Sequence, residues 1–316
     1  MESIGAARLL MKTYTPQFPP AIGVALAVIA VTSFCETARV VGQVPGVAVT
    51  AASRSVRPGD VVVLTIVTAA PATSVRVRAF GRDLRPFAVD AKTWRVLAGI
   101  DLETAPATYP IVVEAGDAGA IARATHRLAV TPRKFRTRTL TVDPAFVNPP
   151  ASALPRIERE TAELNQLWAN SAPARLWDGP FSRPVPDAAN SAFGTRTILN
   201  GQPRSPHSGA DFNSGTGTPI KAPNGGRIVV AGDRYFTGNT VMIDHGLTLF
   251  SLFAHLSEID VHVGDMVKTD DVVGKVGATG RVTGPHLHWS VRLNGARVDP
   301  LSLLSALGAG SGREQP

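Results

Sequence analysis

The chain has 316 residues, of which 44% are hydrophobic, enough for two packed domains and an extension. Its single cysteine excludes an internal disulfide framework, and its 29 glycines and 25 prolines favour β-strands joined by many turns. The net charge of +7 predicts attraction to anionic surfaces. No helix-turn-helix, zinc-finger or aromatic RNA-binding pattern accompanies that charge, so we exclude nucleic acid as a partner.

Residues 1–38 have the pattern of a targeting segment. Basic residues precede an uncharged run at 21–34, which suits the apolar core of a signal peptide and is shorter than the roughly 20 residues of a membrane span. We predict export to the periplasm or cell envelope, with cleavage between Cys35 and Ala38. Retention as an anchor in the inner membrane is the alternative. Lipid attachment at Cys35 is disfavoured by the bulky Phe34 before it.

Short strands separated by turns are expected over residues 44–142. The candidate strands are residues 61–67, 74–80, 94–102, 109–115 and 120–130. Segment 74–80, for example, alternates polar and apolar residues, as a half-buried strand does. This spacing, without helical periodicity, predicts an immunoglobulin-like β-sandwich that lacks the usual cysteine pair. His126 lies in an alternating run and is expected on the exposed face.

Residues 143–180 are predicted to link this domain to a second one. Apolar residues recur at helical spacing from 152 to about 170, with charged residues on the other face, which predicts a connecting helix that packs one domain on the other. We expect Trp168 and Trp177 in core or interdomain contacts. The preceding basic run, residues 133–138, is interpreted as a solvated face, with binding of an anionic polymer as the alternative.

A second β-domain is predicted over residues 181–305, followed by a disordered tail at 306–316. Its candidate strands are residues 227–231, 240–244, 249–253 and 272–276. His245 lies in an Asp-His-Gly turn and is interpreted as structural. His262 is expected to be an exposed strand residue.

Three segments of the second domain carry the candidate chemistry. In Gly284–Trp289, an extended strand would turn His286 and His288 to one side and Leu287 toward the core. Two imidazoles on one face repel each other when both are charged, and burying both without water or another polar partner is unfavourable. A metal ion bound by the imidazoles removes both penalties.

Upstream, His207 and Asp211 add an imidazole and a carboxylate four residues apart. With one histidine of the later pair they make three protein ligands, which is the catalytic arrangement for zinc when a fourth position stays open. His255 lies in an apolar strand-like run. Alone it would be interpreted as a core histidine, but beside the other two segments it becomes a candidate site residue.

Together the segments H-S-G-A-D, F-A-H-L and G-P-H-L-H-W resemble the LytM/lysostaphin-type zinc metallopeptidases, which cut peptide bonds in bacterial peptidoglycan. The resemblance runs from about residue 193 to residue 304. It implies a compact antiparallel β-domain that binds one zinc ion per chain through His207, Asp211 and His288. It also implies that His255 and His286 are catalytic, one taking a proton from water and the other stabilising the oxyanion, in an order that the sequence leaves open.

Other hydrolytic mechanisms lack support. The sequence contains no H-E-x-x-H motif, which would indicate a metallopeptidase with a glutamate base, and no G-x-S-x-G elbow, which would indicate a serine nucleophile. The function expected is therefore a zinc-dependent endopeptidase that hydrolyses peptide cross-links of peptidoglycan. Two alternatives remain: a non-catalytic wall-binding regulator that activates another hydrolase, and a zinc-bearing interaction module. A regulatory protein partner and membrane anchoring through residues 1–38 are further expectations.

Overall fold

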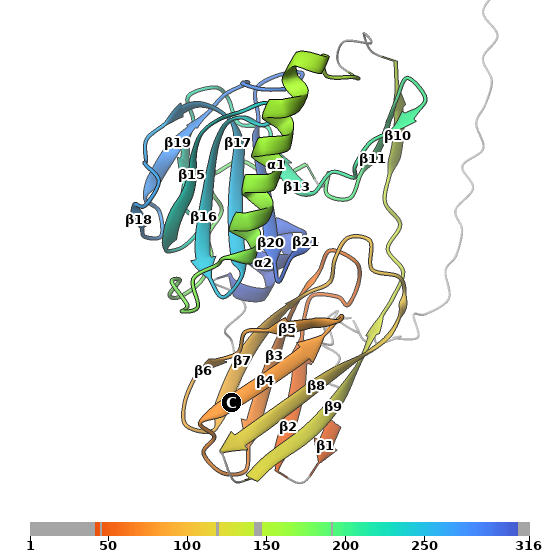
Figure 1. Ribbon diagram of the computed structural model, residues 1–316, viewed down its shortest axis with the longest axis vertical. Coiled ribbons are helices and arrows are strands. Elements are labelled where there is room, and N and C mark those ends of the chain that lie inside the picture. The colour runs from red at the N-terminus through yellow and green to blue at the C-terminus, as the bar shows by residue number, and fades with distance from the viewer. Residues whose placement is uncertain (1–41, 45, 118–119, 142–146, 191, 309–316) are drawn as a thin grey trace, which may run out of the picture. The chain divides into compact units, whose positions relative to one another are not determined.

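The structure is a computed structural model (Figure 1), and the residues it describes are 42–44, 46–117, 120–141, 147–190 and 192–308. The predicted targeting segment, residues 1–38, lies outside this part of the chain, as do residues 309–316 of the predicted tail. The predicted mainly β architecture is confirmed. Along the described part of the chain, no helix is both long and apolar enough to cross a membrane.

Residues 42–130, here called the N-terminal β-domain, form two antiparallel sheets. The first has the strand order β1 (Gly42–Val44), β2 (Val47–Ala52), β3 (Val61–Thr68), β7 (Thr93–Gly99) and β6 (Phe87–Ala88). The second has the order β5 (Arg82–Leu84), β4 (Ser74–Ala79), β8 (Ala107–Asp117) and β9 (Ala120–Val130). Alternate residues of β4 are buried, and both sheets contribute to one apolar core that includes Leu64 and Ile111.

The predicted exposure of His126 is wrong, because its side chain is buried with 2% of its surface exposed. Residues two apart in a strand share a face, so His126 lies with the buried Ala124 and Leu128, while Arg123 and Arg127 face outward. Burial lowers the pKa of His126. Its Nδ1 has no hydrogen-bond partner among the described residues.

A small sheet and a helix follow. The sheet contains β10 (Thr137–Leu140), parallel to β11 (Arg196–Leu199), and β12 (Gln202–Pro203), antiparallel to β11. A 3-10 turn, η2 (Ala151–Ala153), leads into α1 (Leu154–Ala169). Leu164, Leu167 and Trp168 of α1 pack against a buried apolar face of the following sheet, and Figure 1 shows α1 in front of β16 and β17.

Residues 209–307, here called the C-terminal β-domain, contain the second large sheet. Its strands and final helix are β13 (Gly209–Phe212), β14 (Pro219–Lys221), β15 (Gly226–Arg234), β16 (Gly238–Gly246), β17 (Leu249–Ile259), β18 (Met266–Val267), β19 (Val272–Val276), β20 (Leu287–Leu293), β21 (Ala296–Val298) and α2 (Pro300–Leu307). The main order is β13-β20-β17-β16-β15-β18, with antiparallel pairs throughout. Phe212, Phe253 and Trp289 lie fully buried in its core.

The two β-domains share packed residues. Val61 and Leu97 of the N-terminal β-domain belong to the same buried apolar cluster as the core of the C-terminal one. Trp177 is 5% exposed and contacts the ring of Phe87, which confirms its predicted core and interdomain position. Arg133 departs from the predicted solvated face, because its guanidinium lies 3.1 Å from a carboxylate oxygen of Asp299.

Candidate functional site

Strand pairing brings a carboxylate and an imidazole together. β13 and β20 are antiparallel, and in their register Asp211 stands directly opposite His288. Residues in such positions have Cβ atoms about 5 Å apart, so their side chains interact across the strands. His207 lies just before β13, where its backbone N–H donates to the carbonyl of Thr195 and its own carbonyl accepts from Gly194. These two backbone hydrogen bonds fix the position of His207 just before β13.

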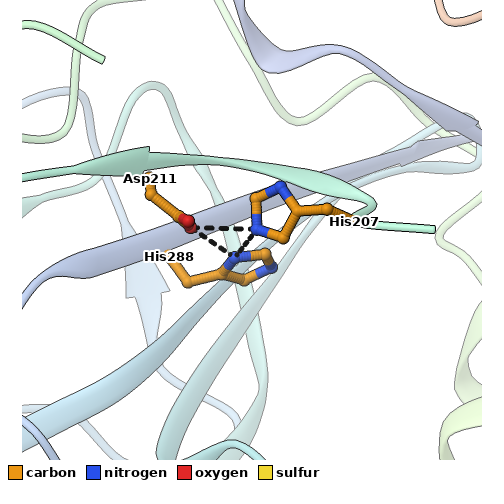
Figure 2. A group of neighbouring side chains, drawn as sticks. All are labelled: His207, Asp211 and His288. Carbon is orange, nitrogen blue, oxygen red and sulfur yellow. Dashed lines mark hydrogen bonds and ion pairs between the residues drawn. The ribbon is translucent and has the colours of Figure 1, made fainter. Parts of the chain in front are cut away.

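Figure 2 shows these three side chains converging on one point. Nε2 of His207 lies 3.0 Å from Oδ1 of Asp211, and Nδ1 of His288 lies 2.9 Å from the same oxygen. The two ring nitrogens are 3.0 Å apart. Each side chain is about one-fifth exposed, so the cluster is open to solvent on one side.

This cluster fits a zinc ion. In the neutral tautomers that carry the proton on the outer ring nitrogen, two imidazole lone pairs and a carboxylate oxygen face one another, an arrangement that a cation satisfies. Ligand atoms of a tetrahedral zinc site are separated by about 3.3 Å when the bonds are about 2.0–2.1 Å long. The three separations here, 2.9 to 3.0 Å, are close to that value. His207, Asp211 and His288 can therefore hold a metal ion.

The electrostatics favour an ionised Asp211 carboxylate and a neutral His288 ring. Burial raises the pKa of Asp211, but hydrogen bonds and positive charge from His207 and His288 outweigh it and hold the pKa well below its usual value. Burial lowers the pKa of His288, against the hydrogen bond to Asp211. A deprotonated carboxylate and a neutral imidazole are the forms that bind zinc.

His255 reaches the cluster from a distorted part of β17. Its φ of +69° is in the left-handed region, which non-glycine residues rarely adopt, and the pairing of β17 with β19 shifts register just after it. Its backbone N–H donates to the carbonyl of Thr237. The distortion lets the ring lie 5.0 Å from that of His286 and 6.1 Å from that of His288, measured between centroids.

His286 lies immediately before β20 and forms an isolated bridge with Gly277. Its Nε2 is 3.9 Å from Oδ1 of Asp211, a longer distance than the 2.9 and 3.0 Å that separate this oxygen from His288 and His207. Its Nδ1 is 2.9 Å from the carbonyl oxygen of Gly284. Leu287 between the two histidines is fully buried. The structure thus brings all five sequence-predicted residues together, three in contact and two beside them.

Sequence reasoning missed the steric role of Gly209. A Cβ at this position would lie 2.6 Å from Cε1 of His288 and 2.5 Å from the carbonyl oxygen of Trp289. It also missed Thr279, whose carbonyl oxygen accepts from Nδ1 of His255. The glycine inside H-S-G-A-D could have indicated the close approach of Gly209 to His288. The hydrogen bond between His255 and Thr279 joins residues 24 positions apart, and no sequence pattern indicated it.

The remaining histidines of the C-terminal β-domain lie apart from the cluster. His245 is fully buried, and its ring nitrogens face the Gly225 carbonyl and the Ser251 hydroxyl, as its structural interpretation predicts. It belongs to β16 rather than to an isolated turn. The side chain of His262 is 93% exposed, which confirms its predicted exposure, although it lies outside the strands.

Comparison with known proteins places these residues in a family pattern. The family model for Peptidase family M23 matches residues 205–300, which include all five. The chain is also similar to a crystal structure of a protein assigned to peptidase M23 from Pseudomonas aeruginosa. The two are 35% identical with a TM-score of 0.63, over 80% of this chain and 96% of that one. This likeness extends well beyond the C-terminal β-domain.

Two curated relatives match more locally. The DD-carboxypeptidase/endopeptidase Mpg of Neisseria meningitidis is 43% identical over 97 residues, 31% of this chain. The peptidoglycan DD-endopeptidase ShyA of Vibrio cholerae is 40% identical over 96 residues, 30% of this chain. In each case the match spans only 22% of the relative's own length.

Proposed function

The chain belongs to peptidase family M23, and from this premise we propose that it is a zinc-dependent endopeptidase that hydrolyses peptide cross-links of bacterial peptidoglycan. The observation that carries the proposal is the convergence of His207, Asp211 and His288 on one point beside His255 and His286. The first three residues are the proposed ligands of one zinc ion per chain. The other two are the proposed catalytic residues.

The two proposed catalytic histidines are held in the same tautomer, with the proton on Nδ1. When bound, zinc supplies a Lewis acid that polarises a peptide carbonyl and lowers the pKa of water. Because a carbonyl oxygen only accepts, Nδ1 of His255 donates to Thr279 and Nδ1 of His286 donates to Gly284. Each neutral ring therefore keeps a lone pair on Nε2. One ring accepts the proton of the attacking water, and the other, when protonated, donates to the developing oxyanion.

A non-catalytic regulator of another wall hydrolase is the main alternative. Loss of a ligand side chain would favour it, but His207, Asp211 and His288 are all present and in contact. An interaction module that merely carries zinc would have no need of a second pair of histidines beside the metal site. The position of His255, kept in a strained backbone conformation, therefore supports the enzyme.

The names of the relatives support a substrate and a location. Mpg and ShyA are named for DD-endopeptidase activity, and we infer that this chain acts on cross-links between stem peptides. Such a substrate requires export to the periplasm or cell envelope. Residues 1–38 are the proposed signal peptide or inner-membrane anchor, and a regulatory protein remains a proposed partner.

We further infer the domain plan 44–142, 143–180 and 181–305, with an immunoglobulin-like fold for the first domain. Two antiparallel sheets around one apolar core support that fold type. The connecting helix α1 lies within the middle segment and packs on the C-terminal β-domain. The proposed tail, residues 306–316, overlaps the end of α2 at residues 306 and 307, which are helical rather than disordered.

The experiment is digestion of purified cross-linked sacculi by the full-length chain with zinc, followed by mass spectrometry of the released muropeptides. We expect cross-linked dimers to become monomers, and the masses identify the bond that is cut. His207→Ala should abolish the conversion, whereas His262→Ala, which changes an exposed histidine away from the site, should leave it intact. Bound zinc without conversion by the wild type would favour the regulator instead.

A further inference from the structure

An arginine that forms no ion pair with any carboxylate among the described residues lies beside the proposed catalytic residues. Arg281 belongs to the loop between β19 and His286, and its backbone N–H donates to the carbonyl of Phe236. Its guanidinium carbon lies 4.7 Å from the centroid of the Phe236 ring, a cation–π contact. Two residues earlier in the same loop, Thr279 accepts the hydrogen bond of His255. The aromatic contact and the backbone bond therefore hold Arg281 next to the site.

A second arginine lies in the segment that leads to the metal cluster. Arg204 lies three residues before His207, and its Nη2 donates to the carbonyl of Val147 and to Oε1 of Gln202. Its Nε is buried and has no hydrogen-bond partner among the described residues. Partial burial of its guanidinium lowers the pKa of Arg281, and the positive charge of Arg204 lowers it further.

This pair of like charges is not neutralised within the described part of the chain. Neither guanidinium forms an ion pair with a described carboxylate, whereas Arg54, Arg156, Arg234 and Arg297 all do. Arg281 is also exposed, so a ligand can reach it. An unneutralised guanidinium attracts an anion, and its planar shape matches a carboxylate with two parallel hydrogen bonds.

We propose that Arg281, assisted by the charge of Arg204, binds a free carboxylate of the substrate peptide next to the bond that is cut. The inference rests on the proposed function and adds a determinant of substrate choice to it. Arg281 is a substrate-binding residue here, and the Phe236 ring keeps its guanidinium in place. A peptide whose carboxylate is replaced by a carboxamide would lose the charge-assisted bonds and keep the scissile bond unchanged.

The test uses two substrates and four forms of the full-length chain with zinc. The substrates are a purified cross-linked muropeptide and the same compound with its free carboxyl groups amidated. The enzymes are the wild type, Arg281→Gln, Arg204→Gln and the control Arg227→Gln, which changes an exposed arginine on β15. We expect amidation to lower kcat/KM of the wild type and of Arg227→Gln by about tenfold to a hundredfold.

For Arg281→Gln, kcat/KM on the free acid should fall by a similar factor, and amidation should then have little further effect. Arg204→Gln should show a smaller loss of discrimination. A purely structural role of Arg281 in supporting the Thr279 loop would lower the rate on both substrates equally and preserve their ratio, and that result would overturn the inference. Failure of the wild type to cut either substrate would instead count against the proposed function itself.

Binding supplies a readout that is independent of turnover. In the His255→Ala background, the dissociation constant of the free-acid muropeptide should rise about tenfold or more when Arg281→Gln is added. The amidated muropeptide should bind both forms equally weakly. Equal binding of the free acid with and without Arg281 would contradict the proposed carboxylate contact.

Discussion

Nδ1 of His255 donates a hydrogen bond of 2.9 Å to the backbone carbonyl of Thr279. The bond joins the distorted strand β17 to the loop that leads to His286, and it fixes the ring with Nε2 free. Burial lowers the pKa of His255 to about 4, with a further contribution from the positive charges of His288 and His286. The ring is therefore neutral near pH 7 and available as a proton acceptor.

The first prediction separates catalysis from metal binding. His255→Ala should keep its zinc and lose cross-link hydrolysis by a factor of about 100 to 10,000, because on the proposed mechanism the ring takes a proton or stabilises the oxyanion and is not a ligand. The measurement is initial rate together with bound zinc by mass spectrometry of the metal. His262→Ala is the control, and near-normal turnover of His255→Ala would remove the role assigned to it.

The second prediction concerns Gly209, whose backbone lies close to the ring of His288. Gly209→Ala places a methyl group 2.6 Å from the His288 ring, so the ring must move and zinc affinity should fall about tenfold to a hundredfold. Competition with a chelator measures that affinity. Gly232→Ala is the matched control, because no atom of the described residues beyond its chain neighbours lies within 4 Å of a Cβ there. Equal affinities for the two variants would show that the close approach is unimportant.

A third prediction is the loss of stability in acid through His245. Burial lowers the pKa of this histidine from 6.5 to about 4, although the hydrogen bond to Gly225 opposes the shift. Above pH 6.5 neither state is protonated and the histidine imposes no penalty. As the pH falls from 6.5 to about 4, the unfolded chain binds a proton that the folded chain does not, so the free energy of unfolding decreases.

The expected decrease is on the order of 3 kcal/mol across that interval. Denaturant unfolding of the wild type and of His245→Gln at pH 7 and pH 4.5 measures it. The variant should be less stable at pH 7, because a buried hydrogen-bonded ring is lost, yet should depend less on pH. The same dependence in both proteins would assign the acid sensitivity to other groups, such as the buried His126.

The fourth prediction concerns the contact between the β-domains. Nη2 of Arg297, on β21, lies 2.7 Å from Oδ1 of Asp101, which follows β7, and its Nε lies 3.1 Å from Oδ2. A double-mutant cycle with Asp101→Ala and Arg297→Ala should give a coupling free energy of about 1–2 kcal/mol, measured by denaturant unfolding. The more exposed pair Glu114–Arg123 should give less than about 1 kcal/mol. Equal coupling in both pairs would contradict a special role for the interdomain pair.

Much of the architecture could be predicted because it depends on local patterns. The alternation at 74–80 corresponds to β4, and the helical periodicity after 152 corresponds to α1. The two-residue spacing of His286 and His288 placed both near Asp211. Side chains alternate between the two faces of a strand, so with Arg123 and Arg127 facing outward this alternation would have indicated the burial of His126.

Other features could not be predicted, because they depend on strands distant in sequence. The pairing of Asp211 with His288 joins residues 77 positions apart, and only the register of β13 and β20 reveals it. The positive φ of His255 arises where its backbone bonds to Thr237, not from its own preference. The cation–π contact of Arg281 with Phe236 likewise needs two loops to meet.

Reconstitution with zinc tests the central claim most directly. The full-length chain is stripped with a chelator, zinc is added in steps, and muropeptide cleavage and bound zinc are measured at each step. We expect no cleavage without metal, a rise in proportion to bound zinc up to one equivalent per chain, and no rise for His207→Ala. Cleavage by the stripped chain, or a full equivalent of zinc bound by His207→Ala, would contradict a zinc-dependent endopeptidase built on this residue cluster.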